Sequence, residues 1–103
     1  MIVGTLSQFE VDTPRKFQID GEDVLVVRVG DKIFAVSDTC THSEVSLSEG
    51  DIYDGKVECW MHGAAFDLRT GQALTPPATQ ALETYLVALG DQPDPDVIVT
   101  AQQ

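Results

Sequence analysis

Residues 40–62 of this chain read CTHSEVSLSEGDIYDGKVECWMH, and this stretch contains every cysteine and every histidine of the sequence. It begins with Cys40 and His42 and ends with Cys59 and His62, so the order is Cys-x-His, sixteen residues, and Cys-x2-His. Each half brings one thiolate and one imidazole close together, and both are metal ligands. The pattern therefore predicts two loops that face each other and bind metal through four side chains.

Two thiolates and two imidazoles suit a pair of bridged irons. Thiolate is a good ligand for ferric iron, whereas neutral imidazole is a weaker donor without charge. When one iron holds the cysteine pair and the other holds the histidine pair, the two irons differ, and the histidine-bound iron accepts the electron. We therefore predict one Rieske-type [2Fe–2S] cluster and no catalytic residue. The predicted cofactor and metal ligands are Cys40, His42, Cys59 and His62.

Three other interpretations of the same residues stay open. Zinc also binds two cysteines and two histidines, but its common modules order them Cys-Cys and then His-His, whereas here they alternate. Alternatively, the cysteines are buried apolar residues and the histidines are surface residues, which requires all four to fall into this spacing by chance. A catalytic Cys–His pair is the third interpretation, and the sequence shows no accompanying nucleophile signature. The cluster is favoured over all three.

The apolar runs on both sides of this stretch are short and typical of strands. Residues 22–29 (EDVLVVRV) and 32–37 (KIFAVS) are separated by Gly30 and Asp31, which predicts a hairpin. Further strands are expected at residues 2–11, 16–19, 82–89 and 97–100. No segment keeps a 3.6-residue period for three turns, so the fold class expected is all-β, a sandwich or small barrel with an inserted loop-rich site.

The net charge and the apolar runs of the sequence indicate which partners and which cell compartment to expect. The 103 residues, enough for one domain, include 17 acidic and six basic residues for a formal net charge of −11, so nucleic acid and anionic membranes are poor partners. A basic protein is the natural electrostatic partner, although the same charge would also serve solubility alone. No signal peptide is recognised in residues 1–20, and no apolar run approaches the roughly 20 residues of a membrane span. We expect a cytoplasmic protein without membrane contact, whose cysteines bind metal or stay reduced.

Two segments of the chain resemble the cluster loops of Rieske-type ferredoxins. They are CTHSEVSLSEG and CWMHGAAFDLRTGQALTPPATQALETY, and the similarity is close over residues 33–86. The four ligands are in register, and so are His62-Gly63, Phe66-Asp67 and the prolines at 76–77. The resemblance implies a Rieske fold of three antiparallel sheets in one domain. A cluster-binding subdomain, residues 38–77, would be inserted into a basal β domain made of residues 1–37 and 78–103.

The resemblance also assigns roles around the cluster. It implies that Cys40 and Cys59 hold an inner iron, that His42 and His62 hold an outer iron near the surface, and that the loop at Pro76-Pro77 covers the cluster. Relatives of high potential carry an extra cysteine in each loop and hydroxyl groups near the sulfurs.

This chain departs from those high-potential relatives at four positions. Val45 and Met61 stand where the extra cysteines would be, and Ala64 and Phe66 stand where the hydroxyl groups would be. Val45 and Met61 are expected to form an apolar contact in place of a disulfide. Because hydrogen bonds to the sulfurs raise the potential, their absence predicts a low one, about −150 mV.

Trp60 is a further departure, because many relatives have proline directly after the second cysteine. In one interpretation its ring packs beneath the cluster subdomain. In the other it lies on the rim near His62 as an apolar contact for a partner, since aromatic residues are favoured at the centres of interfaces.

The resemblance implies an electron carrier that is not itself an enzyme. Its expected partners are a flavoprotein reductase that uses NAD(P)H and a terminal oxygenase that hydroxylates aromatic rings, with the carrier acting as a monomer. Four acidic residues in or between the loops could steer a basic reductase: Glu44, Glu49, Asp51 and Asp54. Two alternatives are a small subunit of an assimilatory nitrite reductase, and a Rieske protein that accompanies an iron–sulfur assembly system.

Overall fold

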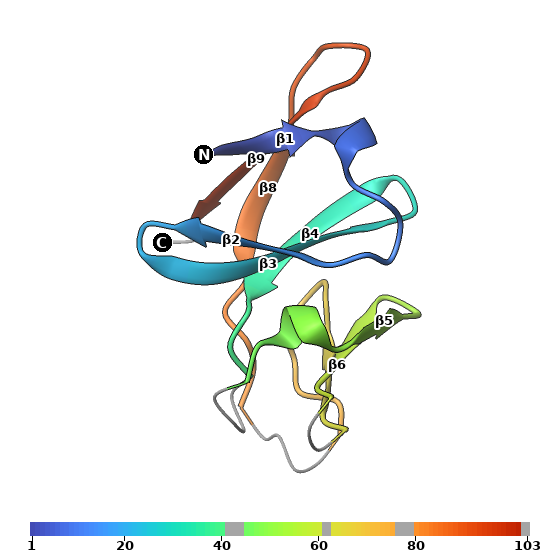
Figure 1. Ribbon diagram of the computed structural model, residues 1–103, viewed down its shortest axis with the longest axis vertical. Helices are drawn as coiled ribbons and strands as arrows, with labels where there is room; N and C mark the ends of the chain where they lie inside the picture. The colour runs from blue at the N-terminus through green and yellow to red at the C-terminus, as the bar shows by residue number, and fades with distance from the viewer. Residues whose placement is uncertain (41–44, 61–62, 76–79, 102–103) are drawn as a thin grey trace.

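A computed structural model describes the chain except for residues 41–44, 61–62, 76–79 and 102–103. The described residues form three antiparallel sheets of three strands each, together with two short 3-10 helices (Figure 1). The predicted all-β class with three antiparallel sheets is confirmed. The described part of the chain contains no helix with the length and hydropathy needed to cross a membrane.

The middle sheet contains the predicted hairpin. It is formed by β2 (Arg15–Ile19), β3 (Glu22–Val29) and β4 (Lys32–Ser37), in the order β2-β3-β4. Val29 pairs with Lys32 across a two-residue turn. Gly30, the first residue of this turn, has a φ of 61°, a left-handed conformation that residues with a side chain rarely adopt. Both strands have the predicted bounds, because a β-branched run and a glycine turn point to the same structure.

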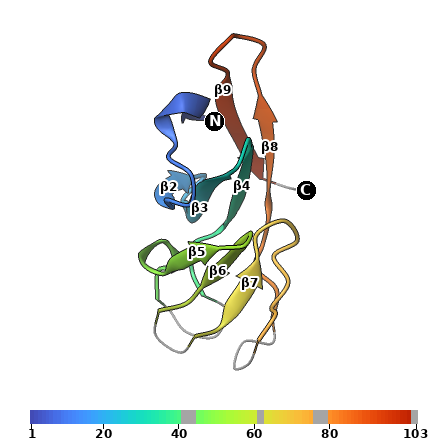
Figure 2. The ribbon, with the colours of Figure 1, turned by 90° about the vertical axis from the view of Figure 1, so that its right-hand side faces the viewer.

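The other two sheets lie on opposite sides of the middle sheet, as Figure 2 shows. One consists of β1 (Ile2–Thr5), β9 (Asp96–Ala101) and β8 (Tyr85–Leu89), so it joins the two ends of the chain. The other consists of three strands of three residues each, β5 (Asp51–Tyr53), β6 (Lys56–Glu58) and β7 (Ala65–Asp67). This last sheet lies entirely within the segment where the sequence predicted a loop-rich site.

Strand β3 is buried on both faces and separates two apolar cores. Leu25 and Val27 belong to one core, and Val24 and Val26 belong to the other. This explains the unbroken apolar run VLVV at residues 24–27, since a strand covered on one face only would alternate apolar with polar residues. The cysteine-side core contains Leu25, Val27, Val36, Cys40, Leu47, Val57, Cys59, Ala64, Phe66, Leu68 and Leu82. The basal core contains Phe9, Ile19, Val24, Val26, Ile33, Ala35, Val97 and Val99.

The strand predicted at residues 2–11 is only partly correct. Strand β1 ends at Thr5 and a 3-10 helix, η1 (Leu6–Gln8), follows it. The backbone N–H of Thr5 donates a hydrogen bond of 2.9 Å to the Gln8 side-chain oxygen, and the two residues form a capping box. Local capping therefore replaces strand pairing after Thr5. The later strand predictions were closer: β8 begins three residues after 82, and β9 spans one residue more than 97–100 at each end.

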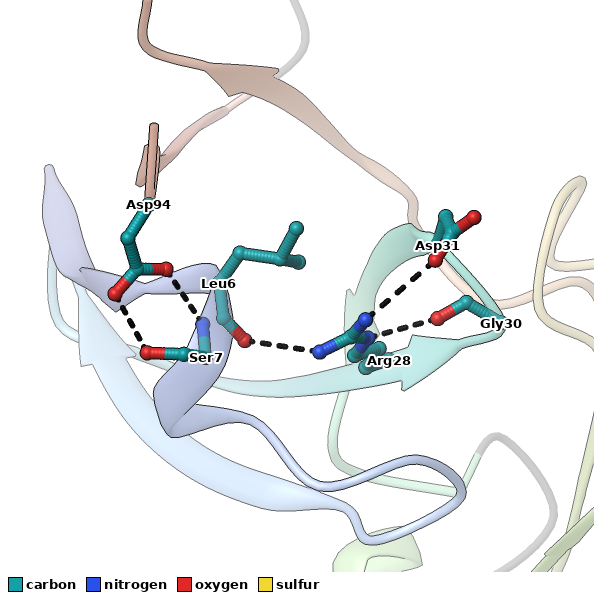
Figure 3. Close-up of polar contacts among 6 residues, drawn as sticks. All are labelled: Leu6, Ser7, Arg28, Gly30, Asp31 and Asp94. Atoms are coloured by element: carbon teal, nitrogen blue, oxygen red, sulfur yellow. Dashed lines mark hydrogen bonds and ion pairs between the residues drawn. The ribbon is translucent and has the colours of Figure 1, made fainter. Parts of the chain in front are cut away.

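Polar contacts close the end of the molecule that lies farthest from β5–β7 (Figures 1 and 3). The Ser7 N–H donates to Asp94 Oδ1 at 2.9 Å, and the Ser7 hydroxyl donates to Asp94 Oδ2 at 2.5 Å. These bonds hold the pKa of Asp94 below its usual value, because they stabilise the ionised carboxylate. Arg28 donates from Nε to the Gly30 carbonyl at 2.7 Å and from Nη1 to the Leu6 carbonyl at 3.4 Å. Side chains thus join η1 to the β8–β9 loop and to the β3–β4 hairpin.

Candidate cluster-binding site

The two cysteines occupy equivalent positions in two hairpins. The Cys40 N–H donates to the Val45 carbonyl at 3.1 Å, and Thr39 pairs with Ser46 in an antiparallel bridge. The Cys59 N–H donates to the Ala64 carbonyl at 2.7 Å, and the preceding Glu58 pairs with Ala65 in the β6–β7 ladder. In both cases the cysteine ends the first arm, and the residue five positions later begins the second arm.

Both cysteines are buried in the same core. The residues are 3% and 1% exposed for Cys40 and Cys59, and both are thiols that belong to the cysteine-side core. Buried thiols at matching positions of two hairpins fit the inner pair of ligands for an iron–sulfur cluster, because thiolates hold such clusters and apolar surroundings keep them dry. His42 and His62 lie outside the described residues, so their assignment as ligands stays a prediction.

The residues that replace the hydroxyl groups of high-potential relatives are fully buried. Ala64 and Phe66 both have an exposed fraction of 0% and belong to the cysteine-side core. Neither side chain has a group that could donate a hydrogen bond to a sulfur. Val45 is half-buried and packs against the same core, whereas Met61 lies outside the described residues. The expected contact between Val45 and Met61 therefore stays a prediction.

A third segment is attached to the second hairpin through Thr75. The Ala65 N–H donates to Thr75 Oγ1 at 2.9 Å, and the Thr75 hydroxyl donates to the Gly63 carbonyl at 3.4 Å. The Leu74 N–H also donates to the Ala65 carbonyl at 2.8 Å. The chain therefore reaches Pro76 from a position beside the second hairpin. Pro76 and Pro77 themselves lie outside the described residues. The sequence analysis did not single out Thr75, although its place directly before the prolines was a usable signal.

The surface around β5 and β6 combines an exposed aromatic ring with negative charge. Trp60 is 53% exposed, so the interpretation in which it packs beneath the subdomain is wrong. Glu49, Asp51 and Asp54 are exposed, and Glu44 lies outside the described residues. The Tyr53 hydroxyl donates to Glu58 Oε2 at 2.9 Å, and this bond together with the charge of Glu58 raises the pKa of Tyr53.

Comparison with known proteins agrees with this geometry. The family model described as "Rieske [2Fe-2S] domain" matches residues 1–86. The ferredoxin component of biphenyl 2,3-dioxygenase from Rhodococcus jostii (strain RHA1) is 45% identical over 85 residues, which cover 82% of this chain and 76% of that protein.

Solved structures give the same result over nearly the whole chain. The ferredoxin of carbazole 1,9a-dioxygenase from Nocardioides aromaticivorans IC177 superposes with a TM-score of 0.90 at 32% identity and covers 99% of this chain and 97% of its own. A ferredoxin solved in a complex of reduced oxygenase and oxidized ferredoxin of carbazole 1,9a-dioxygenase has a TM-score of 0.88 at 34% identity. It covers 97% of this chain and 100% of its own. The chain therefore belongs to the Rieske [2Fe–2S] family, and over most of its length it is similar to ferredoxin components of dioxygenase systems.

Proposed function

We propose that this ferredoxin carries single electrons from an NAD(P)H-dependent flavoprotein reductase to a terminal oxygenase that acts on an aromatic ring. The observation that carries the proposal is the pair of matched hairpins, each of which places a buried cysteine at the end of its first arm. The dioxygenase ferredoxins to which the chain is similar, one of them in complex with its oxygenase, support the downstream partner. The reductase is proposed from the resemblance to carriers of this kind.

The proposed ligands are Cys40, His42, Cys59 and His62. Bound there, a [2Fe–2S] cluster supplies a one-electron couple whose oxidised form has no net charge when its two thiolates are counted. Cys40 and Cys59 would bind from within the cysteine-side core, where Leu47 and Phe66 exclude water. The histidines follow the cysteines by two and three positions in the sequence. By resemblance to the family, they would bind the outer iron, on the side of the site turned toward partners.

A low reduction potential fits the residues near the site. Ala64 and Phe66 offer no hydroxyl group, and the net charge of −11 opposes the uptake of a further negative charge. Exposed charges count for little beyond a Debye length of about 8–10 Å, so the missing hydroxyl groups are the larger effect. We propose a potential near the lower end of the Rieske range, about −150 mV. A redox titration with a midpoint potential above zero would instead place the protein among the high-potential Rieske proteins.

The exposed acidic residues suggest how the reductase is recognised. Glu49, Asp51 and Asp54 lie on or beside β5, close in sequence to the second hairpin. They would steer a basic reductase toward the site, which predicts an electron-transfer rate that falls as salt concentration rises. We also propose a monomer in the cytoplasm, with residues 38–77 forming a cluster-binding subdomain and residues 1–37 and 78–103 forming the basal domain.

The function is tested by reconstitution. Purified ferredoxin is combined with NADH, a flavoprotein reductase and a terminal oxygenase found by pull-down or in the gene neighbourhood. We expect the hydroxylated product to form only when the ferredoxin is present. If the partner recovered is a sirohaem nitrite reductase or an iron–sulfur assembly protein, and the oxygenase receives no electrons, the proposal is wrong.

A further inference from the structure

Asp38 is the only charged residue that is buried among the residues described. It is 1% exposed, follows directly after the end of β4, and precedes Cys40 by two positions. A buried carboxylate is costly unless hydrogen bonds or an opposite charge compensate it. Among the described residues, the one ion pair joins Arg28 to Asp31 and does not involve Asp38. Within that part of the chain, hydrogen bonds compensate the carboxylate.

Ser46 of the first hairpin and Ser48 of η2 (Leu47–Glu49) supply these bonds. The Ser48 N–H donates to Asp38 Oδ1 at 2.8 Å, and the Ser46 hydroxyl donates to Asp38 Oδ2. The two serine hydroxyl groups are themselves 3.0 Å apart and hydrogen-bonded. The Asp38 side chain therefore connects the first arm of the hairpin with its second arm and with the 3-10 helix η2.

The backbone of Asp38 is also fixed on both sides. Its N–H donates to the Asp23 carbonyl at 3.0 Å, and its carbonyl accepts from the Leu47 N–H at 2.6 Å. Leu47 and Cys40 belong to the same core, and Ser46 pairs with Thr39 immediately before Cys40. Asp38 is thus a rigid, negatively charged group at the base of the hairpin that carries Cys40.

We propose that Asp38 is a positioning residue for the first hairpin and that its buried charge lowers the reduction potential of the cluster. The proposal rests on the proposed function, because it requires a cluster at Cys40. Reduction adds one negative charge to the site, and a fixed negative charge nearby opposes it. Water and salt screen a buried charge much less than an exposed one, so Asp38 outweighs any single surface carboxylate.

The test is the midpoint potential of the holoprotein carrying Asp38→Asn. Asparagine keeps the shape and still accepts the Ser48 N–H bond, but it removes the charge. We expect the potential to rise, with a change on the order of tenfold in the equilibrium constant of reduction, or about 59 mV for one electron. The matched control is Asp94→Asn, which removes an exposed charge at the far end and should leave the potential unchanged.

A second variant separates charge from structure. Ser46→Ala keeps the charge of Asp38 but removes a hydroxyl that partly offsets it, so the potential should fall while stability decreases. If Asp38→Asn does not assemble a cluster, the sign of the Ser46→Ala shift decides, and no shift or a rise overturns the proposal. An Asp38→Asn potential equal to that of Asp94→Asn also overturns it. Wild-type protein that binds no cluster would instead refute the proposed function itself.

Discussion

The two cores, one on each face of the middle sheet, differ in the side chains that form them. The buried residues of the basal core have only hydrocarbon side chains, and they come from the middle sheet, from β9 and from Phe9. The cysteine-side core contains two cysteines, and on the side away from the middle sheet its strands have only three residues each. Short strands bury little apolar surface by themselves. We infer from this comparison that the basal core is complete as a protein core, whereas the cysteine-side core also needs the cluster that Cys40 and Cys59 are proposed to bind.

Removing one cluster ligand should have the largest effect and should separate the two cores. Cys40→Ser is expected to abolish the colour and the spectrum of the reduced protein, because serine is a poor ligand for this cluster. Hydrogen exchange should then increase strongly in β5, β6 and β7 and much less in β3 and β9. Equal protection of both regions in the variant would show that the cysteine-side core does not need the cluster.

A matched pair of phenylalanine substitutions sharpens the same contrast. Phe66 and Phe9 are 0% and 1% exposed, one in each core. Either change to alanine should lower the free energy of unfolding by about 3–5 kcal/mol, as measured in denaturant. Only Phe66→Ala should also speed the loss of iron to a chelator. If Phe9→Ala releases iron equally fast, the two cores are tightly coupled and do not act separately.

Substitution of Trp60, on the surface beside Cys59, should have a smaller effect, and this effect should appear in the kinetics with a partner protein. Because its side chain is 53% exposed, Trp60→Ala should leave stability and midpoint potential nearly unchanged. An aromatic contact with a partner would be lost, so the apparent KM for the ferredoxin should rise severalfold in the reductase or oxygenase assay. Tyr53→Ala, at an exposed aromatic residue of β5, is the control. If the kinetics of Trp60→Ala are unchanged, Trp60 does not contribute to docking.

Substitution of Asp94, at the end of the molecule far from the site, should have the smallest effect on thermal stability, and this effect should depend on pH. The pKa of Asp94 is lowered in the folded protein by the Ser7 hydrogen bonds. Its stabilising contribution is therefore present above the usual aspartate pKa of 3.8 and is lost as the pH falls through the lowered value. The difference in Tm between wild type and Asp94→Asn should be small at pH 7 and should narrow toward pH 3. A difference that widens in acid would contradict this sign.

Much of the fold could be predicted from local sequence, but only where local signals agreed. The hairpin of β3 and β4 was predicted with its observed bounds, since its β-branched run and its Gly30 turn favour the same structure. The first strand was predicted too long because the capping box at Thr5 competes with strand pairing. The strands around the site have three residues each, too few to show a period of two.

The site was predicted as a set of residues, and its supports were not. Cys40 and Cys59 came from ligand chemistry and spacing, and the structure places both in one core. Their equivalent places in two hairpins depend on pairing between arms, which the sequence does not display. Asp38 was missed because an aspartate before a turn is usually exposed, and only the packing of η2 and β3 around it makes it buried.

We propose above all that Cys40 and Cys59 share one [2Fe–2S] cluster with His42 and His62. The most direct measurement is the electron paramagnetic resonance spectrum of anaerobically purified, reduced protein, with iron and zinc analysed in the same sample. We predict two irons per chain and a signal whose average g value is lower than that of a centre with four cysteine ligands, because imidazole donates less to the reducible iron. Colourless protein that contains zinc, lacks iron and folds equally well without iron would contradict the account.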